Sequence, residues 1–142
     1  MTELPSDNNA YRFPVSVKGV VLRDGAVVLV RNSRGEWELP GGKLELSETP
    51  EGCVAREIEE ELQLAVVPER LLDTWVYTIA AGTHVLVLTY GCSEASVRQP
   101  VLSHEHDELR WVPIAELDAL EMPESYRASI RRWATQERRD AP

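Results

Sequence analysis

The segment with the clearest structural pattern is GKLELSETPEGCVAREIEEELQL, residues 42–64. Thr49 carries a side-chain oxygen that caps helices well, and Pro50 stands where the first helical residue would be. No β-branched run follows, and apolar residues recur every four positions from Val54 onward. The segment therefore predicts a helix that begins at Pro50 and packs one apolar stripe against a sheet.

One side of this helix collects three carboxylates. At about 100° per residue, Glu57, Glu60 and Glu61 fall on one arc of its surface. Each like-charged pair costs roughly a few tenths of a kcal/mol, and anions near a helix C-terminus also oppose the helix dipole. A bound cation would offset both costs, whereas the alternative is a solvated face on which Arg56 neutralises its neighbours. The glycines at 41–42 favour the cation, because they allow a close approach of the backbone.

The same segment resembles the Nudix box, which reads glycine, five residues, glutamate, seven residues, then Arg-Glu-apolar-x-Glu-Glu-x-Gly-apolar. Of its nine specified positions, eight agree in this chain: Gly42, Glu48, Arg56, Glu57, Ile58, Glu60, Glu61 and Leu64. The exception is Gln63, where the family has glycine. Because glycine there supplies a left-handed helix cap, we expect Gln63 to alter how the helix ends and to leave the carboxylates untouched.

The resemblance implies both a fold and an activity. The fold is α/β, an α/β/α sandwich with a mixed central sheet on which the box helix packs. The activity is that of a divalent-metal-dependent hydrolase, which cleaves a pyrophosphate linkage by attack of a metal-activated water on phosphorus. The expected substrate is a nucleoside diphosphate derivative or a nucleoside triphosphate, oxidised ones included, and the expected cofactor is Mg²⁺ or Mn²⁺.

The resemblance also assigns roles to individual residues. The expected metal ligands are Glu57, Glu60, Glu61, Glu45 and a backbone carbonyl of Gly41 or Gly42. The expected catalytic residues are Arg56, Glu57, Glu60, Glu61 and Glu105. Arg56 would orient the carboxylates, while Glu105, in the charged run LSHEHDE at 102–108, is the first choice for the general base. The alternatives for the base are Glu60, Asp107 and Glu108.

Substrate contacts are less clearly marked. Arg31 and Lys43 are cations near the box that would grip phosphate, although exposed solubilising charge is the simpler explanation. Trp75 is an aromatic residue of a predicted strand, which favours core packing over stacking on a base or sugar of the substrate. His104 and His106 are interpreted as surface residues rather than ligands, because Mg²⁺ prefers oxygen donors.

Composition limits the partners and the compartment. The net charge of -9 repels polyanions, so nucleic-acid binding is disfavoured and a small phosphorylated substrate fits only with a metal. No apolar run reaches the roughly 20 residues of a membrane span, and the N-terminus has no signal-peptide core. Cys53 and Cys92 are expected to be buried thiols of a cytoplasmic protein. A homodimer would fit the family, but no segment marks an interface.

Length and turn signals predict one domain. The 142 residues are expected to divide into a flexible N-terminal tail at 1–12 and a single domain at 13–142. Asp24-Gly25 predicts a hairpin turn, the run at 84–92 a central strand, and Pro68 the end of a strand. The expected strands are 15–23, 26–32, 37–39, 43–46, 64–67, 71–79, 84–92 and 109–113, and the expected helices beyond the box are 114–120 and 124–138.

Two other functions stay open. The fold also suits a nucleotide-sensing or protein-binding module without catalysis, in which the box would be structural. Such a module has little need for three mutually repelling glutamates, which argues against it. The other function is an RNA 5′-end pyrophosphohydrolase, which the acidity of the chain disfavours.

Overall fold

A computed structural model describes residues 10–80, 82–104 and 106–140 of the chain. Its strands are β1 (Val15–Arg23), β2 (Ala26–Arg31), β3 (Trp37–Glu38), β4 (Gly41–Lys43), β5 (Val66–Ala80), β6 (Thr83–Glu94) and β7 (Glu108–Pro113). Its helices are α1 (Pro50–Leu62), a 3-10 helix (Ile114–Ala119) and α2 (Glu124–Asp140). The strands therefore come in two runs, which α1 separates.

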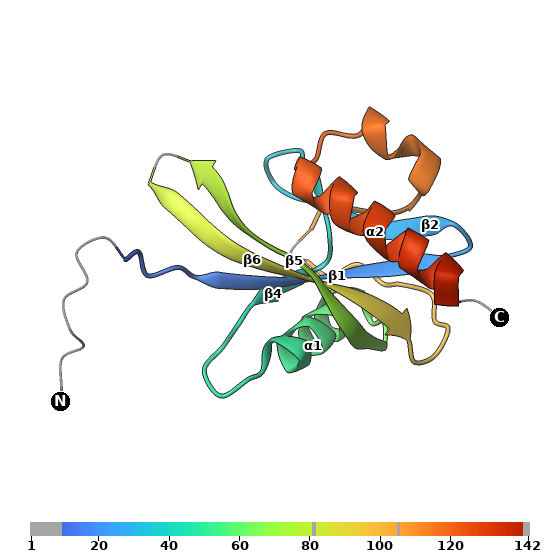
Figure 1. Ribbon diagram of the computed structural model, residues 1–142, viewed down its shortest axis with the longest axis horizontal. Coiled ribbons are helices and arrows are strands. Elements are labelled where there is room, and N and C mark those ends of the chain that lie inside the picture. Colours follow the sequence, from blue (N-terminus) through green and yellow to red (C-terminus); the bar gives the residue numbers. More distant parts are fainter. Residues whose placement is uncertain (1–9, 81, 105, 141–142) are drawn as a thin grey trace.

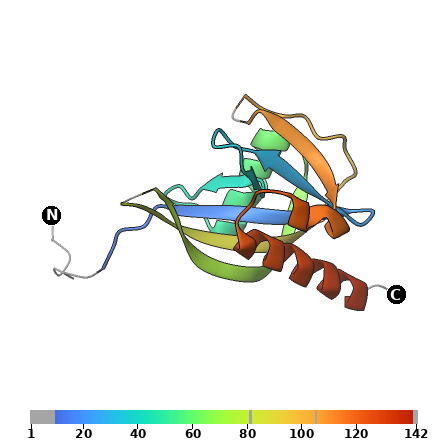
Figure 2. The same ribbon diagram turned by 90° about the horizontal axis from the view of Figure 1, so that it is seen from above.

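The described strands form a seven-stranded sheet with the main order β3-β2-β1-β6-β5. β1 and β6 run parallel, with Val15 opposite Leu86 and Val21 opposite Cys92. The other strand pairs are antiparallel, including β4 on β1 and β7 on β2 (Figure 2). The predicted mixed central sheet is thus confirmed.

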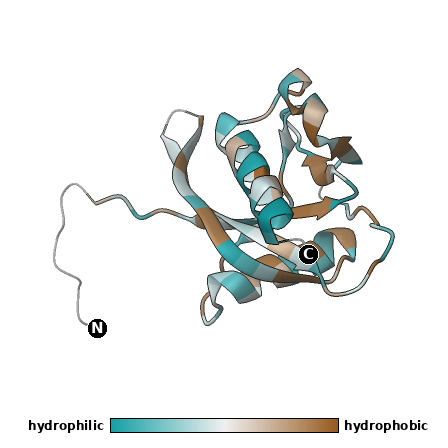
Figure 3. Cartoon of the chain, turned by 45° about the vertical axis from the view of Figure 1, so that its right-hand side comes forward, coloured by the Kyte–Doolittle hydropathy of each residue, from teal (hydrophilic) through white to brown (hydrophobic). Residues whose placement is uncertain are grey.

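The two long helices cover opposite faces of this sheet (Figure 1). Val54, Ile58 and Leu62 of α1 are fully buried against one face. Ile130 and Trp133 of α2 pack on the other, while the outer side of α2 is mostly hydrophilic (Figure 3). The predicted α/β/α sandwich is confirmed, with one apolar core on each side of the sheet.

A glycine brings α1 close to the sheet. A Cβ on Gly19 of β1 would lie 2.7 Å from Cδ1 of Ile58, closer than real Cβ atoms approach. β4 pairs with this same strand, with Gly42 opposite Val17. The polar side of α1 is therefore held beside the two glycines that precede the helix.

Three local predictions are confirmed. The Thr49 side chain caps α1, because its Oγ1 accepts a hydrogen bond from the Gly52 backbone N–H at 3.0 Å, and Pro50 is the first helical residue. Asp24 and Gly25, with φ of 51° and 78°, form the tight turn between β1 and β2. The strand predicted as central, β6, lies between β1 and β5.

The prediction that Pro68 ends a strand is wrong. β5 runs through it without interruption from Val66 to Ala80. It tolerates a proline because it is the edge strand, where a missing backbone N–H need not break a ladder. The register with β6 shifts between Pro68 and Arg70, which is where an edge strand absorbs such an irregularity.

The strand predicted at 43–46 also differs. β4 ends at Lys43. Glu48 then donates its backbone N–H to the Glu45 carbonyl at 3.3 Å, and Leu46 between them is 98% exposed. A turn therefore replaces the last part of the predicted strand and leads Glu48 toward the start of α1.

The remaining expectations concern the two cysteines, the N-terminal residues and membrane spans. Cys53 and Cys92 are buried and free, as predicted. Of the predicted tail at 1–12, residues 1–9 lie outside the described part, while Tyr11 packs edge-on against neighbouring aromatic rings. Neither α1 nor α2, nor any other described helix, has the length and apolar composition of a membrane span.

Candidate active site

Arg56 organises the acidic side of α1. Its Nε and Nη2 donate hydrogen bonds to Glu48, at 2.7 and 2.8 Å. Its Nη1 donates to Glu57 at 3.0 Å and to Glu60 at 3.2 Å. Because these hydrogen bonds stabilise the ionised form, the pKa of Glu48 falls to about 2. One guanidinium thereby holds three carboxylates, one from the loop and two from the helix.

Gly42 makes room for Glu57. A Cβ on Gly42 would collide with the Glu57 carboxylate, so that carboxylate lies directly against the β4 backbone. Cys53, one turn earlier on α1, has its Sγ 3.7 Å from the Gly42 carbonyl oxygen. Two helix side chains, those of Cys53 and Glu57, therefore contact the β4 backbone at this glycine.

Glu61 is the buried member of the acidic set, with only 1% of its surface exposed. Its Oε2 accepts a hydrogen bond from the Gly41 backbone N–H at 3.1 Å. Its Oε1 lies 2.9 Å from His106 Nδ1, an ion-pair contact that lacks the alignment of a hydrogen bond. This oxygen has no hydrogen-bond partner among the described residues. A buried carboxylate needs its charge compensated, so Glu61 is suited to binding a cation.

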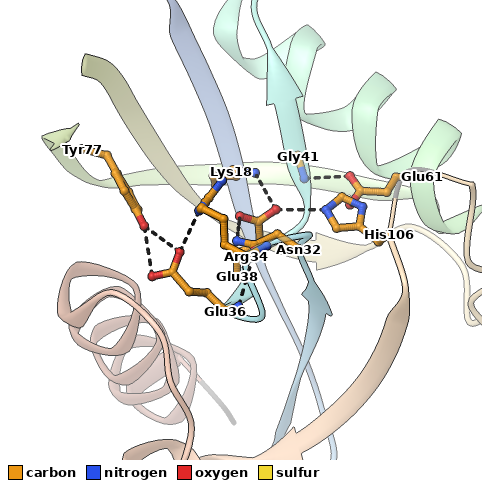
Figure 4. Close-up of polar contacts among 9 residues, drawn as sticks. All are labelled: Lys18, Asn32, Arg34, Glu36, Glu38, Gly41, Glu61, Tyr77 and His106. Carbon is orange, nitrogen blue, oxygen red and sulfur yellow. Dashed lines mark hydrogen bonds and ion pairs between the residues drawn. The ribbon is translucent and has the colours of Figure 1, made fainter. Parts of the chain in front are cut away.

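A second carboxylate, Glu38 of β3, lies on the other side of His106 (Figure 4). His106 Nε2 is 2.9 Å from Glu38 Oε1. Asn32 donates to Glu38 Oε2 at 3.1 Å, and Lys18 Nζ lies 3.9 Å from Oε1. Burial opposes ionisation of Glu38, but the contacts with these three residues prevail and lower its pKa to about 2.

His106 lies between two carboxylates, which favour the protonated form of its imidazole. Its hydrogen bond to Glu38 and its contact with Glu61 raise the pKa of the imidazole to about 9, against the opposing effect of burial. The two carboxylates and the imidazolium thus form a compact, alternating row of charges beside the box helix.

The chemistry of these groups fits a divalent ion. Within the described ranges, no three His, Cys, Asp or Glu side chains are placed so that they could hold a metal ion together. Glu57 and Glu60 instead form hydrogen bonds with Arg56. Two observations favour a cation all the same. Glu61 buries an oxygen without a hydrogen bond, and Gly42 lets the Glu57 carboxylate lie directly against the β4 backbone. Mg²⁺ and Mn²⁺ prefer such oxygen donors.

The family model for the NUDIX domain matches residues 12–133 of the chain. The chain belongs to this family. The Nudix box lies at the junction of β4 and α1, where the Arg56 cluster and the buried Glu61 are found. The match extends well beyond the box and takes in every strand of the sheet.

Relatives and solved structures agree with this assignment. A MutT-like protein of Streptomyces ambofaciens is 44% identical over 80 residues, which are 55% of this Nudix chain and 50% of that protein. The nucleoside triphosphatase NudI of Enterobacter sp. (strain 638) is 31% identical over 127 residues, 78% of this chain and 89% of the relative. The crystal structure of a MutT protein from Methanosarcina mazei Go1 has a TM-score of 0.73 and 26% identity, covering 88% and 95% of the two chains. The chain thus spans half the length of the Streptomyces relative.

The structure brings most of the predicted box residues together. Arg56 contacts Glu57 and Glu60, whereas Glu61 is joined to Gly41 and lies deeper. The Glu45 side chain is exposed, and the contacts of this residue with Glu48 are made by its backbone, whose N–H donates to the Glu48 carboxylate at 2.8 Å. The roles of these residues in metal binding and catalysis stay predictions.

Two of the candidate bases, Asp107 and Glu108, lie beside Arg31. Glu105, the first choice, falls outside the described residues. Asp107 is exposed, and its backbone N–H donates to the Arg31 carbonyl at 3.4 Å. Glu108 is the first residue of β7 and lies 3.8 Å from Arg31 Nη1. Arg31, a predicted phosphate contact, is therefore already paired with one of the candidate bases.

The other two predicted substrate contacts differ in their surroundings. Lys43 is exposed at the end of β4. Trp75 packs with the α2 core, with ring centroids 5.0 Å from Tyr77 and 5.4 Å from Tyr126. Core packing, the favoured interpretation of Trp75, is thus confirmed.

Sequence reasoning missed the interior part of the site. The interpretation of His106 as a surface residue is wrong, since its side chain is only 10% exposed. Glu38 and Lys18 were not anticipated at all. A signal for Lys18 exists, because it is a charge in the middle of an apolar strand, where burial requires a partner. The partner itself comes from a different strand.

Proposed function

We propose that this chain is a divalent-metal-dependent Nudix pyrophosphohydrolase that cleaves a nucleoside triphosphate, with nucleoside diphosphate derivatives as the second substrate class. The observation that carries the proposal is the Arg56 cluster, in which one cation holds Glu57 and Glu60 beside Gly42. Glu57, Glu60 and Glu61 lie close together on the last turns of one helix and repel each other, and Glu61 is buried, so a divalent cation best explains why all three are present.

Two further observations support a nucleotide substrate. The relative named nucleoside triphosphatase aligns over 89% of its own length, so the similarity covers nearly all of that enzyme. The net charge of -9 repels phosphate, and a divalent ion at the box would reverse the sign of the local field.

The residues of the site would have separate roles in metal binding, substrate binding and catalysis. Glu57, Glu60 and Glu61, with the Gly41 or Gly42 carbonyl, would hold Mg²⁺ or Mn²⁺. When bound, the ion neutralises phosphoryl charge and lowers the pKa of a bound water. Arg56 orients the Glu57 and Glu60 carboxylates through its hydrogen bonds. Arg31 and Lys43 would contact phosphate, and the base would come from Glu105, Asp107 or Glu108.

The proposal is tested by mass spectrometry of the products of a nucleotide panel. The panel contains the common nucleoside triphosphates, an oxidised guanine nucleotide, ADP-ribose and a nucleotide sugar, each with Mg²⁺ or Mn²⁺. Reaction in ¹⁸O-labelled water identifies the phosphorus that water attacks. We expect label in a monophosphate or pyrophosphate product. Metal binding without release of any product would favour the non-catalytic module instead.

A further inference from the structure

Three side chains form a row from the sheet to the proposed metal site (Figure 4). Glu38 ends β3, His106 precedes β7, and Glu61 belongs to the last turn of α1. The imidazole stands between the carboxylates, with Nε2 2.9 Å from Glu38 Oε1 and Nδ1 2.9 Å from Glu61 Oε1. Residues far apart in the sequence therefore meet at one interior point.

The outer end of this row is firmly anchored. Asn32 donates to Glu38 Oε2 at 3.1 Å, which leaves Oε1 to face His106. The orientation of the Asn32 amide is itself set, because its Oδ1 accepts backbone N–H groups of Arg34 at 2.9 Å and of Glu36 at 3.1 Å. These hydrogen bonds hold the Glu38 carboxylate in one orientation beside the imidazole.

The position of the Glu61 carboxylate, at the inner end of the row, depends on His106. Among the described residues, the Glu61 carboxylate receives one hydrogen bond, from Gly41 to Oε2, and Oε1 contacts only the imidazole. We propose that His106, anchored by Glu38, is a positioning residue that holds the Glu61 carboxylate for the divalent ion. The inference rests on the proposed function, since it needs the ion to bind at Glu61. Residues behind a metal ligand typically change metal affinity about 10- to 100-fold when they are removed.

The experiment measures Mn²⁺ affinity of the nucleotide-free protein by electron paramagnetic resonance of the free ion. We expect H106A to weaken Mn²⁺ binding about 10- to 100-fold. H106Q should lose less, because its side-chain –NH2 group can still donate a hydrogen bond to a carboxylate. The matched control is H104A, an exposed histidine of the same segment, which should bind Mn²⁺ like the wild type. With saturating Mn²⁺, the KM of H106A for nucleotide should equal that of the wild type.

The outcomes separate this inference from the proposed function. Wild-type Mn²⁺ affinity in a folded H106A overturns the inference, and so does tighter binding, which would mean that the imidazole competes with the ion. If H106A does not fold by circular dichroism, E38Q decides in its place, because it keeps the size of the Glu38 side chain and removes its charge. A wild-type protein that binds no Mn²⁺, or cleaves no nucleotide, overturns the proposed function instead.

Discussion

Glu59 and Glu60 are neighbours on α1 but have different partners. Glu60 lies 3.2 Å from Arg56 Nη1, within the acidic cluster. Glu59 points to the other side of the helix and lies 3.4 Å from Arg98. The pair therefore offers a matched comparison between a proposed metal ligand and an ordinary surface carboxylate.

We expect E60Q to lower kcat by about 100-fold or more with little change in stability, because exposed ion pairs contribute roughly 0 to 1 kcal/mol. The Glu60 side chain is 61% exposed, so the substitution leaves no buried group unpaired. The measurements are steady-state kinetics with Mg²⁺ and the thermal midpoint. E59Q should match the wild type in both, and equal kcat values for E59Q and E60Q would remove Glu60 from the site.

The two box glycines should respond differently to alanine. In G42A the new Cβ meets only the end of the flexible Glu57 side chain, which moves aside, so activity should fall while the thermal midpoint changes little. In G41A the Cβ meets the Val17 backbone, and φ of 144° is itself strained, so a loss of roughly 2 kcal/mol or more is expected. Urea unfolding and kinetics of both variants check this, and a destabilised but active G42A would contradict it.

At the scale of elements, Tyr90 of β6 ties the first turn of α1 to the sheet. Its hydroxyl donates to Glu51 Oε1 at 3.0 Å, and its ring is 7% exposed. Burial, and then the Glu51 carboxylate, raise its pKa to about 12. Deprotonation would place a phenolate beside a carboxylate, so the hydroxyl keeps its proton to a higher pH in the folded protein than in the unfolded chain.

This pKa predicts alkaline destabilisation. The unfolded chain loses the Tyr90 proton near its ordinary pKa of about 10, before the folded protein does, so stability falls as pH rises from about 10 to 12. Up to about 2 kcal/mol of this loss should belong to Tyr90. Y90F should be about 1 kcal/mol less stable at pH 8, where it lacks the hydrogen bond, but should lose less between pH 10 and 12. Parallel pH profiles of the wild type and Y90F would contradict the assignment.

For the molecule as a whole, we expect the net charge of -9 and the acidic box to make folding sensitive to divalent ions. A ligand that binds only the folded state adds about 2.7 kcal/mol at a concentration of 100 times its Kd. We therefore expect Mg²⁺ to raise the thermal midpoint by several degrees, and EDTA to remove the increase. The double variant E57Q/E60Q should show no such increase, and an equal response to Na⁺ at matched ionic strength would reduce the effect to general screening.

Features that depend on near neighbours in the chain were predictable. Thr49 and Pro50 start α1 through groups within three residues of each other, and Asp24-Gly25 forms its turn by local backbone preference. The clustering of Arg56 with Glu60 follows from helical spacing alone. Each of these energies is decided within one turn of chain, which the printed sequence displays directly.

Features that depend on contacts between residues far apart in the chain could not be predicted from the sequence. Pro68 fits within β5 only because β5 happens to be the edge of the sheet. Glu38, Glu61 and His106 are brought together by three separate segments, so neither the burial of Glu61 nor the charge of His106 could be inferred from spacing. The sequence alone thus predicted the acidic helix. The folded sheet decided which residues lie beside its buried carboxylate, because burial and the compensation of charge depend on the space around a residue.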